Sequence, residues 1–321
     1  MSKHLLSLVA IVLGALIASA NHADAQRSPI ADDPLLHGHA LLIGNSHYTD
    51  RRWPTLDDVP LQLVNLRNAL LRHFDTVDVR QDLGADQLRQ TIGHFVRTYG
   101  NVSDARLFIY YAGHGYTETI TQFSEIRGYI TGIDTPSLRA ETASADDAAR
   151  PLSMSMLEIR SLLNEVLARH VLFVFDSCFA GTIFTARSAD DRPKTLTQDV
   201  VVRLMEKPSR EFITAGRANE RVPSHSPLPD LLLAALAGAA DPYDHKVISA
   251  LEIGIYLQDQ MLRDRQFSLT PQVGRLQDPV FAEGEFLFRI VPTAPTKVFP
   301  IHRGFGPTTV GVYRPRTLHT T

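Results

Sequence analysis

Short apolar runs alternate along the chain with segments in which apolar residues recur at helical spacing. Such runs predict buried strands, and the recurring spacing predicts amphipathic helices. Ser155 with Glu158, and Ser249 with Glu252, have the spacing of a capping box and predict two helix starts. The expected strands are 39–43, 77–79, 107–111, 171–175 and 212–214, with shorter ones at 129–133 and 286–288; the expected helices are 61–71, 86–99, 155–166, 231–236 and 249–261.

The expected strands are almost continuously apolar and alternate with the expected helices. Strands of this kind are buried on both faces, which predicts an α/β fold with a mostly parallel sheet between two helical layers. In such sheets ligands bind beyond the carboxyl ends of the strands. The residues directly after each expected strand are therefore the first candidates for chemistry.

The two ends of the chain differ from its middle. Lys3 and His4 precede an apolar run at 5–18, and small residues at 18–20 and 23–25 provide two cleavage sites, the pattern of a secretory signal peptide. The run is shorter than the roughly 20 residues of a membrane span. We therefore expect residues 1–25 to be removed and the mature protein to be exported, to the periplasm or outside the cell. The tail at 291–321 is rich in proline and basic residues and is expected to be extended.

Composition narrows the function. Apolar residues make up 44% and charged residues 21%, as in soluble globular proteins, and 32 basic against 35 acidic residues argue against nucleic acid as the main partner. The one cysteine, Cys178, excludes an internal disulfide and a Cys-x-x-Cys zinc site, and no metal site is predicted. Because cysteines of exported proteins usually form pairs, a lone Cys178 favours a chemical role.

Two expected strands end beside residues that could act together. His114, between two glycines, follows the strand at 107–111, and Cys178 follows the strand at 171–175. A thiolate is a nucleophile, and an imidazole can take the thiol proton and return it to a leaving amine. The backbone N–H groups of Gly115 and Cys178 are placed to bind the oxyanion. If the strands are neighbours, the sequence predicts a Cys/His hydrolase, without an obvious third triad member; the plainer interpretation is a buried thiol and a glycine turn.

The segments around His114 and Cys178 resemble the two catalytic motifs of the caspase-like peptidases. They read Tyr-Tyr-Ala-Gly-His-Gly at 110–115 and Asp-Ser-Cys-Phe-Ala-Gly at 176–181, and are closer to metacaspases and bacterial caspase-like proteins than to animal caspases. The resemblance covers roughly residues 39–290. Three further segments that look like parts of the family are 40–46, 212–216 and 270–276.

The resemblance implies a caspase–haemoglobinase fold, a three-layer sandwich around a six-stranded, mainly parallel sheet. It implies His114 as the general acid/base, Cys178 as the nucleophile, and Asp176 in the pocket for the substrate residue before the cut. An acid in that pocket favours Arg or Lys. Metacaspases usually carry a second acid on the first helix, and Gln62 stands at that position here, which argues against strictly basic specificity.

The same resemblance divides residues 26–290 of the chain into a large-subunit-like part to about residue 186, a linker at 187–210 and a small-subunit-like part at 211–290. Related enzymes often cut this connection themselves, and Arg187 and Lys194 are the expected sites because the linker looks polar and exposed. The implied partner is a polypeptide substrate, with neither nucleic acid nor stable membrane insertion. No cofactor is expected to be required; calcium activation is left open.

Two other functions fit the same residues. A caspase-like interaction module would keep the His/Cys pair without catalysis, and a Cys/His hydrolase or transferase would act on a non-peptide acyl group. The reactivity of Cys178 separates the module from an enzyme, because a catalytic thiol alkylates faster than a free thiol near neutral pH and a buried structural thiol alkylates more slowly.

Overall fold

The computed structural model describes residues 33–120, 125–137, 149–177, 184–192, 195–217, 220, 222–263 and 269–291. The chain divides into one unit, Met1–Val291, and a second, Pro292–Thr321, which lies outside the described residues. The predicted signal peptide, Cys178 and Lys194 also lie outside them. In the part that is described, no helix combines the length and the apolar character that crossing a membrane requires.

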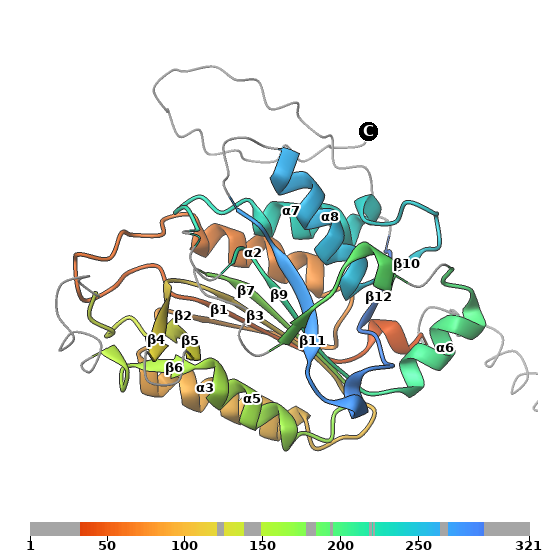
Figure 1. Ribbon diagram of the computed structural model, residues 1–321, viewed down its shortest axis with the longest axis horizontal. Helices are drawn as coiled ribbons and strands as arrows, with labels where there is room; N and C mark the ends of the chain where they lie inside the picture. Colours follow the sequence, from red (N-terminus) through yellow and green to blue (C-terminus); the bar gives the residue numbers. More distant parts are fainter. Residues whose placement is uncertain are drawn as a thin grey trace, which may run out of the picture. The chain divides into compact units, whose positions relative to one another are not determined.

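A seven-stranded sheet forms the centre of the first unit, in the order β2-β1-β3-β7-β9-β11-β8 (Figure 1). Within this sheet, β2, β1, β3, β7 and β9 pair in parallel. β11 and β8 extend the edge beyond β9 in antiparallel pairing. The sheet is therefore mainly parallel, as predicted, but within the described residues it has seven strands instead of six, with β8 at one edge. The strands are β1 His39–Gly44, β2 Thr76–Gln81, β3 Arg106–Ala112, β7 His170–Asp176, β8 Phe184–Ala186, β9 Ser209–Thr214 and β11 Gln272–Leu276.

Side chains alternate between the two faces of the sheet, and helices cover both faces (Figure 1). On one face α2, α7 and α8 pack against strand residues such as Leu42 and Tyr110, and on the other α3 and α5 pack against Leu41 and Tyr111. This is the three-layer sandwich that the apolar runs predict, since strands buried on both faces need apolar side chains throughout. The helices are α2 Val59–Leu70, α3 Ala85–Tyr99, α5 Met156–Asn164, α6 Gln198–Glu206, α7 Leu228–Ala234 and α8 Ala250–Arg263.

Both predicted capping boxes are confirmed at the starts of α5 and α8. The Ser155 hydroxyl accepts the N–H of Glu158 at 3.1 Å, and the Glu158 carboxylate accepts the N–H of Ser155 at 2.7 Å. The corresponding distances at Ser249 and Glu252 are 3.2 and 2.9 Å. Each box satisfies backbone donors that the first turn of a helix leaves without partners.

Two smaller sheets account for the remaining strands. The run at 129–133 becomes part of β5 Glu125–Thr131, which pairs with β4 Gly115–Ile120 and β6 Ser153–Ser155. The run at 286–288, predicted as a strand, lies in β12 Leu287–Arg289, which pairs antiparallel with β10 Val247–Ser249. The apolar pattern predicted the strand but carried no information about its partner.

The connection at 187–210, expected as a linker, contains regular elements where it is described. A 3₁₀ turn, Ala189–Asp191, and α6 lie within it, and Arg210 lies inside β9. The Arg210 guanidinium is buried and donates to the carbonyls of Val166 at 2.8 Å and Leu163 at 3.2 Å, at the end of α5. The charge of Arg210 is buried at this point because it finds backbone acceptors inside the protein.

Candidate active site

The register of β3 and β7 brings the two candidate segments to one edge of the sheet. Ala112 at the end of β3 pairs with Asp176 at the end of β7, and the N–H of Gly113 donates to the Asp176 carbonyl at 3.4 Å. His114 follows Ala112 by two positions, and Cys178 follows Asp176 by two positions. The structure thus confirms that the strands preceding His114 and Cys178 are neighbours; Cys178 itself lies outside the described residues.

Gly113 is required by the crowding between β3 and His114. A Cβ atom at this position would lie 2.5 Å from the Tyr111 hydroxyl and 2.9 Å from the Tyr48 hydroxyl. Both hydroxyls form hydrogen bonds with the backbone of His114. The His114 N–H donates to Tyr48 Oη at 2.8 Å, and Tyr111 Oη donates to the His114 carbonyl at 3.0 Å. Thr131 Oγ1 donates to the same carbonyl at 2.8 Å. The backbone of His114 is therefore held from both sides.

The imidazole of His114 is oriented by a backbone carbonyl. Its Nε2 lies 2.8 Å from the carbonyl oxygen of Pro54, in the loop between β1 and α2. Because a carbonyl only accepts, Nε2 carries the proton and Nδ1 is the nitrogen that can accept one. Burial lowers the pKa of His114 below its ordinary 6.5, although the Pro54 carbonyl acts in the opposite direction. The ring is therefore neutral at pH 7, the state a general base needs.

Sequence reasoning missed the loop between β1 and α2. Tyr48, Trp53 and Pro54 all contact His114, and none of them was a candidate. The available signal was their position directly after the first apolar run, at the same sheet edge as His114, together with the only tryptophan of the chain. A carbonyl partner leaves no trace in the sequence, since every residue has one.

Asp176 is a buried carboxyl that is held by hydroxyl groups. Tyr110 Oη donates to its Oδ2 at 3.1 Å, and Ser226 Oγ donates to its Oδ1. Burial raises the pKa of Asp176 to about 6, while the hydrogen bonds from Ser226 and Tyr110 act to lower it. Burial and the neighbouring Asp176 carboxyl raise the pKa of Tyr110 well above 10, so the phenol stays protonated and donates.

Asp176 and His114 line one small pocket, together with Gln62 from α2 and segment 222–226. Its cavity volume is about 20 Å³, which is room for one water molecule and not for a side chain. Gln62 Nε2 donates to the carbonyl of Ser226 at 3.4 Å. The position at which the resemblance placed a second acid thus does reach this pocket, and it holds an amide there.

Segment 222–226 is fastened to the N-terminal end of α2 as well. The imidazole of His225 contacts the carboxylate of Asp58, directly before α2, and both side chains are exposed, at 79% and 42%. An exposed contact of this kind contributes little to stability, and solvent can compete for it. Ser226, in contrast, binds Asp176 through a buried hydrogen bond.

Gly115 opens β4 and pairs with Ile130 of β5, next to His114. Its N–H was expected to form the oxyanion hole with that of Cys178; this stays a prediction, because the partner lies outside the described residues. Within the described ranges, no group of three or more His, Cys, Asp or Glu side chains is arranged to hold a metal ion.

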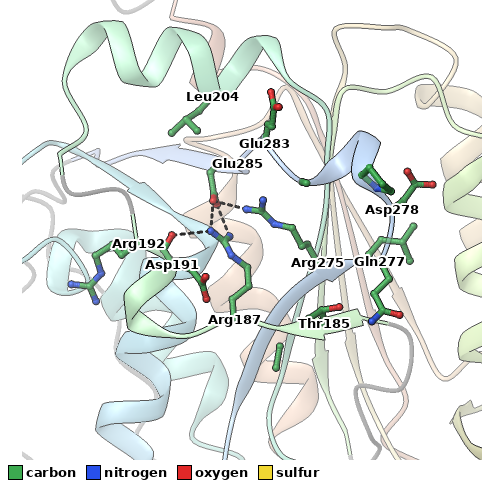
Figure 2. Close-up of a pocket in the computed structure, with 14 residues that line it drawn as sticks. Thr185, Arg187, Asp191, Arg192, Leu204, Arg275, Gln277, Asp278, Glu283 and Glu285 are labelled. Atoms are coloured by element: carbon green, nitrogen blue, oxygen red, sulfur yellow. Dashed lines mark hydrogen bonds and ion pairs between the residues drawn. The ribbon is translucent and has the colours of Figure 1, made fainter.

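The side chain of Arg187 is not exposed, as a self-cleavage site is expected to be. Its side chain is 9% exposed, and its guanidinium contacts the Glu285 carboxylate at 2.5 and 3.0 Å, while Arg275 reaches the same carboxylate at 2.6 Å (Figure 2). Arg187 also contacts Glu211 at 3.2 Å. Burial and the charge of Glu285 raise the pKa of Glu211 well above its ordinary value. These four side chains, named here the edge network, lie beside a cavity of about 600 Å³ next to β8 and β11. The exposure expected for Arg187 is wrong, because its charge is paired inside the protein.

Comparison with known families agrees with the fold. The chain matches the model of the caspase domain over residues 37–250. No curated protein matched the chain. The family match extends over more than half of the chain and includes both strand ends that carry the candidate residues, and this protein therefore belongs to the caspase domain family of cysteine peptidases.

Proposed function

We propose that this protein is a cysteine endopeptidase in which His114 and Cys178 form the catalytic dyad, and that it cleaves after Arg or Lys. One observation carries the proposal: the paired strands β3 and β7 end at the same edge of the sheet. His114, oriented by Pro54, follows β3, and Asp176 ends β7 two residues before Cys178 in the chain. Family membership supports cysteine peptidase activity in general. The catalytic dyad and the specificity for Arg or Lys are proposals that go beyond this general activity.

The orientation of the imidazole suits its proposed role. With Nε2–H donating to the Pro54 carbonyl, Nδ1 of His114 takes the thiol proton of Cys178: the S–H bond breaks and an N–H bond forms. The thiolate then attacks the scissile carbonyl, and the N–H groups of Gly115 and Cys178 are the proposed donors to the oxyanion. The proton on Nδ1 passes to the leaving amine, and a water molecule hydrolyses the thioester that remains.

The surroundings of Asp176 support a basic substrate residue. Its carboxyl is buried, and the groups that bind it among the described residues are the hydroxyls of Tyr110 and Ser226, which carry no charge. A guanidinium or ammonium group from a substrate would supply the missing positive charge through a charge-assisted hydrogen bond. Because the pocket holds about 20 Å³, segment 222–226 has to move before such a side chain enters.

Export after removal of residues 1–25 and activity without a required cofactor are proposals from the sequence alone. Because the sequence leaves calcium activation open, each assay of this protein should be run with and without calcium.

A preference for Arg and Lys that increases with pH is the expected signature of Asp176. Below about pH 6 the carboxyl is protonated, and above it the carboxylate attracts a cation. The ratio of kcat/KM for Arg peptides to that for matched neutral peptides should rise through about pH 6, by about 10- to 100-fold in total. Steady-state kinetics from pH 5 to 8 on fluorogenic peptides that vary only the residue before the cut measures this ratio.

Two variants sharpen that measurement. Asp176→Asn should lose the preference and its pH dependence while neutral peptides are affected far less. Ser226→Ala removes a hydrogen bond that lowers the pKa of Asp176, so the midpoint should move to higher pH. A wild-type preference for Asp, or an Asp176→Asn variant with unchanged preference, would contradict the assignment.

Self-processing, if it occurs, is expected after Lys194 and not after Arg187. Arg187 is held in the edge network by Glu285 and Glu211, whereas a protease needs an extended, accessible backbone. Mass spectrometry of wild type incubated under active conditions should show a fragment that ends at Lys194. Cys178→Ala and Lys194→Gln should stay intact at that bond; a fragment ending at Arg187, or the same cut in Cys178→Ala, would show this expectation to be wrong.

A further inference from the structure

The only tryptophan of the chain lies against the ring of His114. The indole of Trp53 and the imidazole are stacked, with ring centroids 4.6 Å apart and planes inclined by 17°. The phenol of Tyr48 covers the imidazole at 4.9 Å with an inclination of 51°. Half-buried aromatic rings on two sides therefore restrict the positions that the His114 ring can take.

Several hydrogen bonds hold Trp53 in this place. Its Nε1 donates to the carbonyl of Thr135 at 2.9 Å, and its backbone N–H donates to the carbonyl of Asp50 at 3.0 Å. The carboxylate of Asp50 in turn accepts the N–H of Ser137 at 2.8 Å. The indole is thus tied to the segment after β5, and its orientation is set before any substrate arrives.

We propose that Trp53 is a positioning residue for the dyad: its indole face holds the plane of the His114 imidazole and stabilises the imidazolium that forms when Nδ1 takes the Cys178 proton. This inference rests on the proposed function. Trp53 also precedes Pro54, whose carbonyl accepts the hydrogen bond from Nε2–H of His114. One dipeptide therefore orients the ring through its edge and through its face.

The stack is needed because the charged ring is formed in a partly buried place. Burial alone lowers the pKa of His114 and so disfavours the imidazolium. The face of an indole attracts a cation, more strongly than that of a phenol or a phenyl ring. The titratable groups nearby do not replace this effect: Tyr48 and Tyr111 stay neutral, since burial raises the pKa of both, and the pKa of His114 is shifted by burial and by the Pro54 carbonyl, with no contribution from Asp176.

Fluorescence of the intact protein tests the stack without any assay of activity. An imidazolium in contact with an indole quenches its emission, and Trp53 is the only tryptophan present. Emission should fall as the pH decreases, with one transition centred below the ordinary histidine value of 6.5. His114→Gln should abolish the transition, whereas Asp176→Asn and the exposed His47→Gln should retain it. A transition that persists in His114→Gln would overturn the inference.

Two substitutions at Trp53 test its effect on the reaction. Trp53→Leu removes the aromatic face and should lower kcat by about 3- to 30-fold, with KM changed less, because the stack acts on the protonated ring. Trp53→Phe should fall between Trp53→Leu and wild type. NMR titration of His114 should show its pKa lowered further in Trp53→Leu, a shift that mere loss of packing in a folded variant would not produce.

The outcomes separate this inference from the proposed function. If wild type and Cys178→Ala are equally inactive on peptides, the proposed function fails, and the fluorescence titration still reports whether Trp53 stacks on His114. If peptides are cleaved but Trp53→Leu and Trp53→Phe both keep the wild-type kcat and the wild-type His114 pKa, the inference alone is wrong. Circular dichroism and the thermal midpoint verify that each variant is folded.

Discussion

Replacing Cys178 by alanine is expected to abolish peptide hydrolysis, and replacing His114 by alanine is expected to lower kcat/KM by about 10²- to 10⁴-fold. No other thiol can replace Cys178, since the chain contains one cysteine. His114→Ala keeps the nucleophile but removes the group that accepts its proton. Kinetics on the best peptide from the scan of substrate residues, at the pH optimum of the wild type, measures both effects.

His47→Ala is the matched control for the histidine. His47 lies in the same loop as Tyr48, its side chain is 64% exposed, and its Nδ1 lies 3.5 Å from Asp82 Oδ2. Its replacement should leave kcat/KM within about twofold of wild type, as is usual for exposed side chains outside a site. Full activity in Cys178→Ala would refute the cysteine peptidase reading altogether.

The rate of alkylation of Cys178 by iodoacetamide distinguishes an enzyme from a non-catalytic module. A thiol paired with His114 should react faster near pH 7 than a free peptide thiol, and more slowly again in His114→Ala. The alkylation rate of the protein reports on Cys178 alone, because the chain contains one cysteine. A thiol that reacts more slowly than the free peptide in wild type, together with absent turnover, would favour the interaction module.

Breaking the edge network is expected to cause a large loss of stability. Glu285 is 3% exposed and faces two guanidinium groups, from Arg187 and Arg275. Glu285→Gln leaves these charges buried without a full counter-charge, and removal of one partner from a buried pair costs about 3–5 kcal/mol. Urea denaturation followed by circular dichroism should show the midpoint shifted to lower urea with little change in slope.

An exposed pair and a double variant complete this test. Glu283 pairs with Lys207 at 3.2 Å, with side chains 70% and 55% exposed, so Glu283→Gln should change the free energy of unfolding by less than about 1 kcal/mol. Arg187→Met combined with Glu285→Leu removes one charge of each sign and should recover much of the loss seen in Glu285→Gln. Equal effects of Glu285→Gln and Glu283→Gln would contradict the view that burial makes this network matter.

The edge network also bears on the proposed site through its position in the chain. β8 and Arg187 follow Cys178 closely in sequence, and Arg187 connects this part of the chain to Glu211 of β9 and to Glu285. A variant that loses the network should therefore be assayed for peptidase activity as well as for stability. A cut after Arg187 would sever this connection. The buried ion pairs of Arg187 with Glu285 and Glu211 argue against such a cut.

Local signals in the sequence determined most of the sheet and its helices. Nearly continuous apolar runs are diagnostic where strands are buried on both faces, and the Ser-x-x-Glu boxes mark helix starts through contacts only three residues long. The position of His114 and Asp176 at one edge followed from the same logic, because parallel strands place their carboxyl ends together. The family match over residues 37–250 agrees with this interpretation.

Only the tertiary structure decided which distant groups meet. The apolar run at 286–288 does not reveal that β12 pairs with β10, and Arg187 is predicted as an exposed cleavage site as long as its partners are unknown. A polar side chain is buried when a partner compensates its charge, and that partner stands elsewhere in the chain.

The same reason applies to the candidate site. His114 was found from its own neighbours in sequence, but Pro54 and Trp53 reach it from another loop, and Ser226 reaches Asp176 from a third. The sequence by itself determined the strands, the edge and the residue types able to perform the chemistry. The tertiary structure decided the tautomer of His114, the ring stacked on it and the closed pocket at Asp176, because each depends on a contact between segments that only folding brings together.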